Sequence, residues 1–135
     1  MQIKNLIYVV ENKHWVQSKR LEYLSKHQNK YNLKLITARN FYFLWLFGMY
    51  REKKIIFSTW RIVHYFLKKN PNFFKDKHYN NFLASVTSHS NIGGGLDPLN
   101  PIPGRAPDEA YKLAINLLIK FKVVTVNSKL LYNFL

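Results

Sequence analysis

The sequence predicts an α/β protein of the Rossmann-like kind, with a doubly wound, mainly parallel sheet of about five strands and helices on both faces. Five short runs of β-branched or aromatic residues recur along the chain, and helix-like or loop-rich stretches separate them. The runs are apolar almost throughout, which is typical of strands covered on both faces. Strands that alternate with helices form βαβ units, and right-handed crossovers then build a doubly wound sheet.

The first predicted strand spans residues 3–10 and reads Ile-Lys-Asn-Leu-Ile-Tyr-Val-Val. The other four strands are predicted over residues 33–37, 54–59, 82–88 and 122–127. Helices are predicted between them, over residues 15–29, 41–51, 61–69 and 107–120. In the first helix, Leu21, Leu24 and Gln28 share one stripe, and lysines and an arginine occupy the side expected to face water.

The helix over residues 107–120 has the clearest pattern. Its core-facing stripe follows the spacing i, i+3, i+4, i+7, i+8, and consists of Ala110, Leu113, Ala114, Leu117 and Leu118. Pro107 suits the first helical position, and the acidic residues that follow it complement the positive end of the helix dipole. Lys120 stands at the negative end.

A length of 135 residues suits a single domain, residues 1–135. Residues 91–106 form one long irregular stretch rich in glycine and proline, which is typical of a functional loop. Residues 128–135 begin a further helix with an apolar stripe and contain neither glycine nor proline as a stop signal. We therefore expect the sequence to be a fragment, or a natural cut-down domain, of something longer.

Composition indicates a globular protein with an unusual charge. The hydrophobic fraction is 47%, and cysteine is absent, so disulfides and thiolate metal sites are excluded. The longest apolar-rich stretch, residues 41–50, is too short to cross a bilayer, and no signal peptide is recognisable, so a cytoplasmic location is expected. The 21 Lys and Arg against 7 Asp and Glu give a net charge of +14, which favours anionic partners.

Candidate site residues follow the predicted strands, because ligands of doubly wound sheets bind beyond the carboxyl ends of the strands. After the third strand these are Thr59, Trp60 and Arg61, with core packing for Trp60 and a solvated helix start for Arg61 as the structural alternatives. After the fourth strand they are Ser88, His89, Ser90, Asn91, Gly93 and Gly94, where glycine allows close backbone approach to a ligand. Asn127 and Ser128 follow the fifth strand, and also fit a strand end with a helix cap.

The order of a strand, Thr87-Ser-His-Ser-Asn-Ile-Gly-Gly, a proline-rich loop, a helix and Val123-Val-Thr-Val-Asn-Ser-Lys-Leu-Leu resembles the amino-terminal domain of GT-B glycosyltransferases, especially glycosyltransferase family 4. The likeness in element order covers nearly the whole chain, and its specific parts are residues 82–95 and 121–131. The resemblance implies the acceptor-binding half of a two-domain enzyme. The carboxy-terminal donor-binding domain would be absent from this sequence.

The resemblance also implies roles for particular residues. His89 would act as the catalytic residue that lines the acceptor pocket, whereas the structural alternative is a strand-end histidine bonded to a turn. Sugar would pass from a nucleotide-sugar donor to a hydroxyl of a glycan or lipid-linked acceptor, with retention of configuration. The glycine-rich turn that such domains often have after the first strand is missing here, so Lys13 or His14 would contact the donor phosphates through side chains instead.

No cofactor and no metal are predicted, because the histidines lack ligand spacing and the acids are spread along the chain. The aromatic-basic run over residues 41–54 has two interpretations: a buried helix with a solvated basic end, or an element that docks on an anionic membrane surface. The second would place the protein peripherally on the inner face of the membrane.

Two other function classes remain open from the sequence. A basic nucleic-acid-binding module fits the charge and the aromatic content. Against it, zinc-finger, homeodomain and RNP-type signatures are missing and the cations are dispersed, so no specific nucleic acid is expected as a partner. A non-catalytic Rossmann-like remnant is the other alternative, since one fold hosts many functions.

Overall fold

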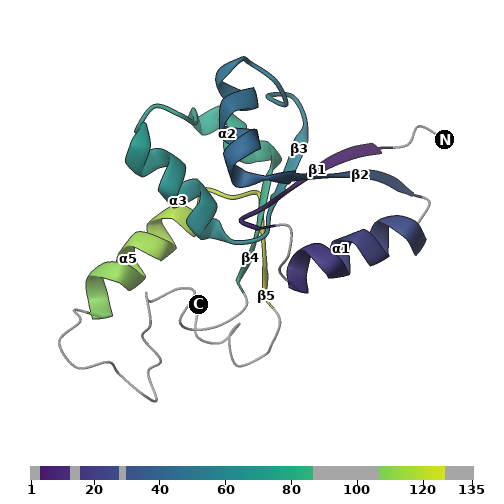
Figure 1. The fold of residues 1–135 in the computed structure, drawn as a ribbon. Coiled ribbons are helices and arrows are strands. Elements are labelled where there is room, and N and C mark those ends of the chain that lie inside the picture. Colours follow the sequence, from purple (N-terminus) through teal and green to yellow (C-terminus); the bar gives the residue numbers. More distant parts are fainter. Residues whose placement is uncertain (1–3, 13–15, 28–29, 87–106, 127–135) are drawn as a thin grey trace.

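The computed structural model describes residues 4–12, 16–27, 30–86 and 107–126 (Figure 1). The strands in this part of the chain are β1 (Lys4–Val10), β2 (Tyr31–Thr37), β3 (Lys54–Phe57), β4 (Phe82–Val86) and β5 (Val123–Val126). The helices are α1 (Val16–His27), α2 (Ala38–Leu46), α3 (Trp60–Lys69), the short 3-10 helix η1 (Asp76–Asn81) and α5 (Pro107–Leu118).

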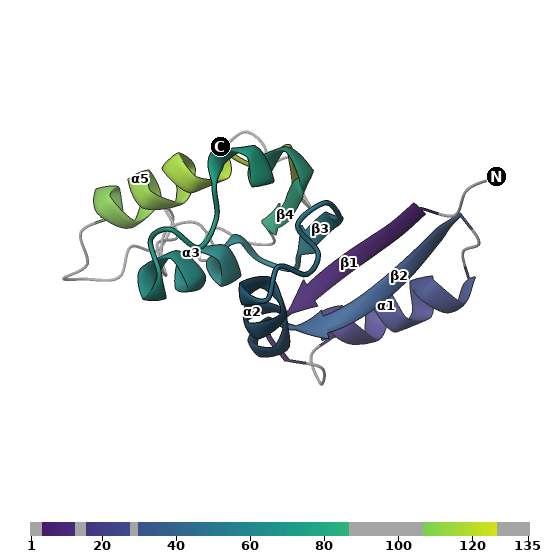
Figure 2. The same cartoon turned by 90° about the horizontal axis from the view of Figure 1, so that it is seen from above.

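The five strands form one sheet in the order β2-β1-β3-β4-β5, and every neighbouring pair is parallel. Helix α1 lies on one face of the sheet, whereas α2, α3 and α5 lie on the other (Figures 1 and 2). The chain therefore winds outward from β1 in one direction through α1 and in the opposite direction through α2, α3 and α5. This confirms the predicted α/β, Rossmann-like fold class.

An aromatic core fills the space between the sheet and α2 and α3. Phe41, Trp45, Phe57, Phe66 and Phe82 are almost completely buried. Phe57 on β3 and Phe82 on β4 meet edge to face with ring centroids 5.1 Å apart, a favoured geometry for aromatic pairs. Residues two apart along the strands point to the same face, so the strands deliver their large side chains to this side together.

Local hydrogen bonds set two boundaries that the sequence pattern misplaced. Helix α2 begins at Ala38, because Thr37 caps it and accepts a 3.4 Å hydrogen bond from the backbone N–H of Asn40 through Oγ1. Strand β3 ends at Phe57, two residues before the predicted end. There Thr59 caps α3, and its Oγ1 accepts a 3.4 Å hydrogen bond from the N–H of Arg61.

Two further features depart from the sequence prediction. In α1, Leu21 is buried but Leu24 is 53% exposed, so the predicted stripe faces the sheet only in part. Between α3 and β4 the chain forms η1, whose His78 and Tyr79 are buried. The predicted loop over residues 91–106 and helix over residues 128–135 lie outside the described residues.

Candidate functional site

The sheet order places one position of special interest between β1 and β3. Chain connections leave these two neighbouring strands toward opposite sides of the molecule, since β1 leads to β2 and β3 leads to β4. In open α/β sheets, ligands bind at such a switch point, beyond the carboxyl ends of the strands. The backbone N–H of Ser58 donates a 2.9 Å hydrogen bond to the carbonyl oxygen of Val9, which holds the two strand ends together.

Glu11 and Arg61 interact electrostatically across this switch point. Glu11 follows the last residue of β1, and Arg61 stands in the first turn of α3. Burial raises the pKa of the Glu11 carboxyl, and the positive charge of Arg61 partly opposes this shift. Both side chains keep exposed surface, so a carboxyl group and a guanidinium are presented at the same edge of the sheet.

Ser58 supplies a hydroxyl to the same edge. Its side chain is 1% exposed, and its Oγ is the one buried side-chain polar atom without a hydrogen-bond partner among the described residues. A buried hydroxyl without a partner costs free energy, and such groups call for an explanation such as a ligand. Ser58 also directly precedes Thr59, the capping residue of α3.

The amino-terminus of α3 adds positive potential. The first turn of this helix contains no acidic residue, so the partial positive charge of the helix dipole is not offset within the turn. Thr59 is buried at 5% exposure and caps the turn. Together with Arg61, the helix end makes this part of the sheet edge suited to anionic or hydroxyl-rich ligands.

Trp60 anchors the start of α3 in the hydrophobic core. The Trp60 side chain is buried and belongs to the hydrophobic core, and its ring lies 5.9 Å from that of His64. Burial and the nearby charge of Lys68 lower the pKa of His64, which favours a neutral imidazole. Of the residues predicted after the third strand, Trp60 thus packs in the hydrophobic core, and Arg61 presents its charge at the surface.

The remaining predicted site residues lie outside the described residues: Lys13, His14, Ser88, His89, Ser90, Asn91, Gly93, Gly94, Asn127 and Ser128. Strands β4 and β5 are described as far as Val86 and Val126. Because both strands are parallel to β3, the chain leaves them at the edge that carries Ser58 and Glu11.

Sequence reasoning noted Glu11 and Ser58 among the residues at the strand ends but did not select them as site residues. Glu11 directly follows the predicted first strand, and Ser58 falls at the end of the predicted third strand, over residues 54–59, but the sequence pattern does not reveal that β1 and β3 are neighbours in the sheet. A signal was present all the same, because a charged residue and a small polar residue each follow an apolar strand. The strand order places these two positions at the same edge of the sheet, on neighbouring strands.

The described residues contain no group of three or more His, Asp or Glu side chains with the proximity that a metal ion needs. Within the same ranges, each helix is too short or too polar to traverse a bilayer.

Comparisons with models of protein families, with curated proteins and with solved structures found no match to this chain.

Proposed function

We propose that this chain is the acceptor-side domain of a GT-B-type glycosyltransferase, which transfers a sugar from a nucleotide-sugar donor to a hydroxyl acceptor. The proposal is supported by two features at the β1/β3 switch point of a parallel sheet: the electrostatic interaction of Glu11 with Arg61, and the buried Ser58 hydroxyl that has no partner. A saccharide is recognised through its hydroxyl groups, which both donate and accept hydrogen bonds. A carboxylate, a hydroxyl and a guanidinium supply the matching acceptors and donors.

The proposed division of labour follows from the charges at this edge. Arg61 and the amino-terminus of α3 attract the developing negative charge of a leaving nucleoside diphosphate. Glu11 orients an acceptor hydroxyl by accepting its hydrogen bond. His89, three residues beyond the last residue of β4, is proposed as the catalytic residue. The nucleotide itself is held mainly by a second domain, so the isolated chain is expected to bind the acceptor without turnover.

Ligand-observed NMR tests the proposal on the 135-residue protein. Saturation-transfer difference spectra are recorded with a panel of mono- and oligosaccharides and with nucleotide sugars. We expect signals from at least one saccharide class, and we expect Arg61→Ala and Glu11→Gln to weaken them about tenfold or more. Lys53→Ala is the matched control, because Lys53 is exposed and directly precedes β3, at the opposite edge of the sheet, and its loss changes the net charge equally.

Two results would contradict the proposal. One is a complete lack of saccharide signals with the wild-type protein. The other is tight, salt-dependent binding of single-stranded nucleic acid that Arg61→Ala and Lys53→Ala weaken equally, which would favour the nucleic-acid alternative. His89→Ala extends the test to the segment after β4, where we expect loss of saccharide binding with an unchanged circular dichroism spectrum.

A further inference from the structure

The helix α2 carries apolar side chains on two opposite faces. Phe41 and Trp45, four residues apart, are buried in the core. The opposite face and the turn that follows carry Phe43, Leu46, Phe47 and Met49, which we call the outer α2 stripe. These side chains are 51%, 47%, 84% and 44% exposed, respectively.

The outer α2 stripe is contiguous along the helix. Phe43, Leu46 and Phe47 follow the spacing i, i+3, i+4, which places them side by side on one helix face. Scattered single apolar residues on a surface need no explanation, but large adjacent ones mark an interaction site. The stripe protrudes at Phe47, the most exposed large hydrophobic residue among the described ones.

Cations flank α2. Arg39 lies one helical turn before Phe43 on the same face, and it is exposed. At the other end of α2, Arg51 donates a 3.4 Å hydrogen bond to the carbonyl oxygen of Trp45. Lys69 lies 5.7 Å from the ring of Tyr42. The sequence has no acidic residue between Glu22 and Glu52, so Glu52 is the single acid of this helix and its turn.

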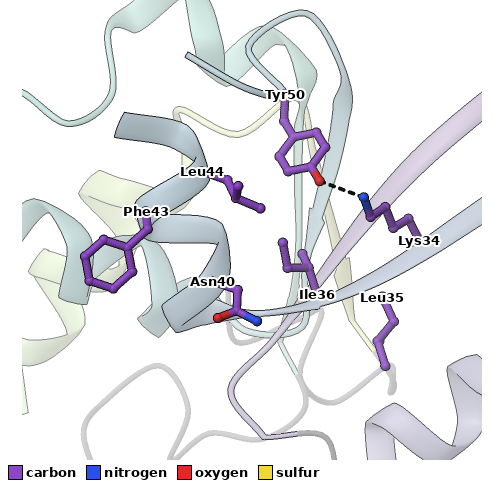
Figure 3. Close-up of a pocket in the computed structure, with 7 residues that line it drawn as sticks. All are labelled: Lys34, Leu35, Ile36, Asn40, Phe43, Leu44 and Tyr50. Carbon is purple, nitrogen blue, oxygen red and sulfur yellow. Dashed lines mark hydrogen bonds between the residues drawn. The ribbon is translucent and has the colours of Figure 1, made fainter. Parts of the chain in front are cut away.

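A pocket of about 460 Å³ adjoins the stripe, between α2 and the edge strand β2 (Figure 3). Its polar lining consists of Lys34, Asn40 and Tyr50, and Phe43 belongs both to the pocket and to the stripe. The ammonium group of Lys34 donates a 2.9 Å hydrogen bond to the hydroxyl oxygen of Tyr50, as the dashed line in Figure 3 shows. An ammonium, an amide and a hydroxyl group are suitable donors to a phosphate.

We propose that the outer α2 stripe binds the surface of an anionic phospholipid bilayer, with the Lys34 pocket receiving a lipid headgroup phosphate. Apolar side chains that protrude between cations match an interfacial helix, whose apolar residues lie roughly 5–10 Å into the headgroup region. Leu46 and Met49 offer no ring for base stacking, which argues against nucleic acid at this surface.

This inference does not rest on the glycosyltransferase proposal, and the two fail separately. The chain lacks cysteine, so a single cysteine can report on one position. Phe47→Cys, labelled with an environment-sensitive dye, is mixed with phosphatidylcholine vesicles with and without phosphatidylserine. We expect a blue shift only with the anionic vesicles.

Ile119→Cys is the matched control for the dye. Ile119 follows α5 and is 74% exposed, so its label meets the same vesicles from a different surface. The proposal expects no blue shift at this position. Equal shifts at positions 47 and 119, or no shift at either, would overturn it.

Vesicle co-sedimentation measures the contributions of the stripe and its cations. Phe43→Ser with Phe47→Ser should lower partitioning onto anionic vesicles at least about tenfold, because two large apolar contacts are lost. Tyr23→Ser with Ile119→Ser removes two exposed apolar residues elsewhere and should change it less than about twofold. Circular dichroism shows that each variant is folded, and equal losses in the two pairs would contradict the proposal.

Two double variants that have the same net charge test the role of the cations. Lys34→Gln with Arg39→Gln should weaken partitioning by about fivefold for each cation at low salt. Lys26→Gln with Lys112→Gln removes the same charge from α1 and α5, and should weaken partitioning far less.

Displacement of the protein from vesicles by inorganic phosphate at constant ionic strength would show that the pocket binds a free anion. If single-stranded RNA displaces the protein from vesicles and the stripe variants do not change this displacement, the cations serve nucleic-acid binding. Either result overturns the proposal.

Discussion

His78 and the backbone of Lys75 form two reciprocal hydrogen bonds. The ring Nδ1 of His78 accepts a 2.9 Å bond from the N–H of Lys75, and the backbone N–H of His78 donates a 2.9 Å bond to the Lys75 carbonyl oxygen. The ring also stands edge-on to Trp45, with centroids 4.9 Å apart. Because Nδ1 accepts a bond, the ring is neutral in this arrangement, and a second proton would displace the Lys75 N–H.

Stability is therefore expected to fall as the pH drops below neutrality. Burial lowers the pKa of His78, the charges of Lys77, Arg51 and Lys75 lower it further, and Glu52 opposes them. With a folded-state pKa below the unfolded value of 6.5, the unfolded chain takes up the proton first. The stabilisation is complete above pH 6.5 and is lost as the pH falls from there through the folded-state pKa, as urea unfolding at a series of pH values will show.

His78→Asn should reduce this pH dependence, because its Oδ1 accepts the Lys75 hydrogen bond without titrating. His64 shifts in the same direction and accounts for the remaining slope. His27→Asn, at the exposed end of α1, is the matched histidine-to-asparagine control. An unaltered slope in His78→Asn would contradict the proposed role of this ring.

Trp45→Phe should destabilise the protein by about 2–4 kcal/mol. The indole Nε1 donates a 3.0 Å hydrogen bond to the carbonyl oxygen of Phe73, and both groups are buried. The variant leaves that carbonyl without its partner and opens a void beside the ring of Phe74. Phe66→Leu, a buried change without a polar atom, should cost only about 1–2 kcal/mol. Equal costs in urea unfolding would show that the hydrogen bond contributes nothing.

Gly48→Ala should cost about 1–2 kcal/mol through backbone conformation alone. Gly48 has a φ of +85°, in the left-handed region, and a Cβ built there meets no atom within 4 Å. Gly48→Asn should cost less, because asparagine tolerates this region better than alanine does. Thermal unfolding compares the two variants. If the alanine variant is as stable as the wild type, the turn does not take part in the cooperative unfolding of the protein.

The sequence was sufficient for the fold class because strand and helix patterns depend on neighbouring residues. All five predicted strands occur, since runs such as residues 3–10 are apolar enough to be buried on both faces. The helix boundaries were less predictable. Thr37 and Thr59 cap helices through single hydrogen bonds, and nothing in apolar periodicity distinguishes a strand-end threonine from a capping one.

The candidate site was predictable only in part, because it depends on which strands are neighbours. Arg61 was selected from its place after the third strand, but its electrostatic partner Glu11 lies fifty positions earlier in the chain. The sequence likewise did not predict that the side chain of Phe47 is exposed. An aromatic run alone does not reveal that α2 buries Phe41 and turns Phe43 outward.

Ser58→Ala should stabilise the protein by about 1 kcal/mol, because it removes a buried hydroxyl that lacks a partner. Thr59→Ala, one residue later, should destabilise it by about 1 kcal/mol through loss of the helix cap. If the two variants change the free energy of unfolding in opposite directions, Ser58 serves ligand binding and Thr59 serves folding, since functional residues commonly reduce stability. Urea unfolding measures both, and saccharide binding by NMR should fall in Ser58→Ala despite its higher stability. If Ser58→Ala instead destabilises the protein as Thr59→Ala does, its hydroxyl serves the fold and the proposed ligand contact at the β1/β3 switch point loses its main support.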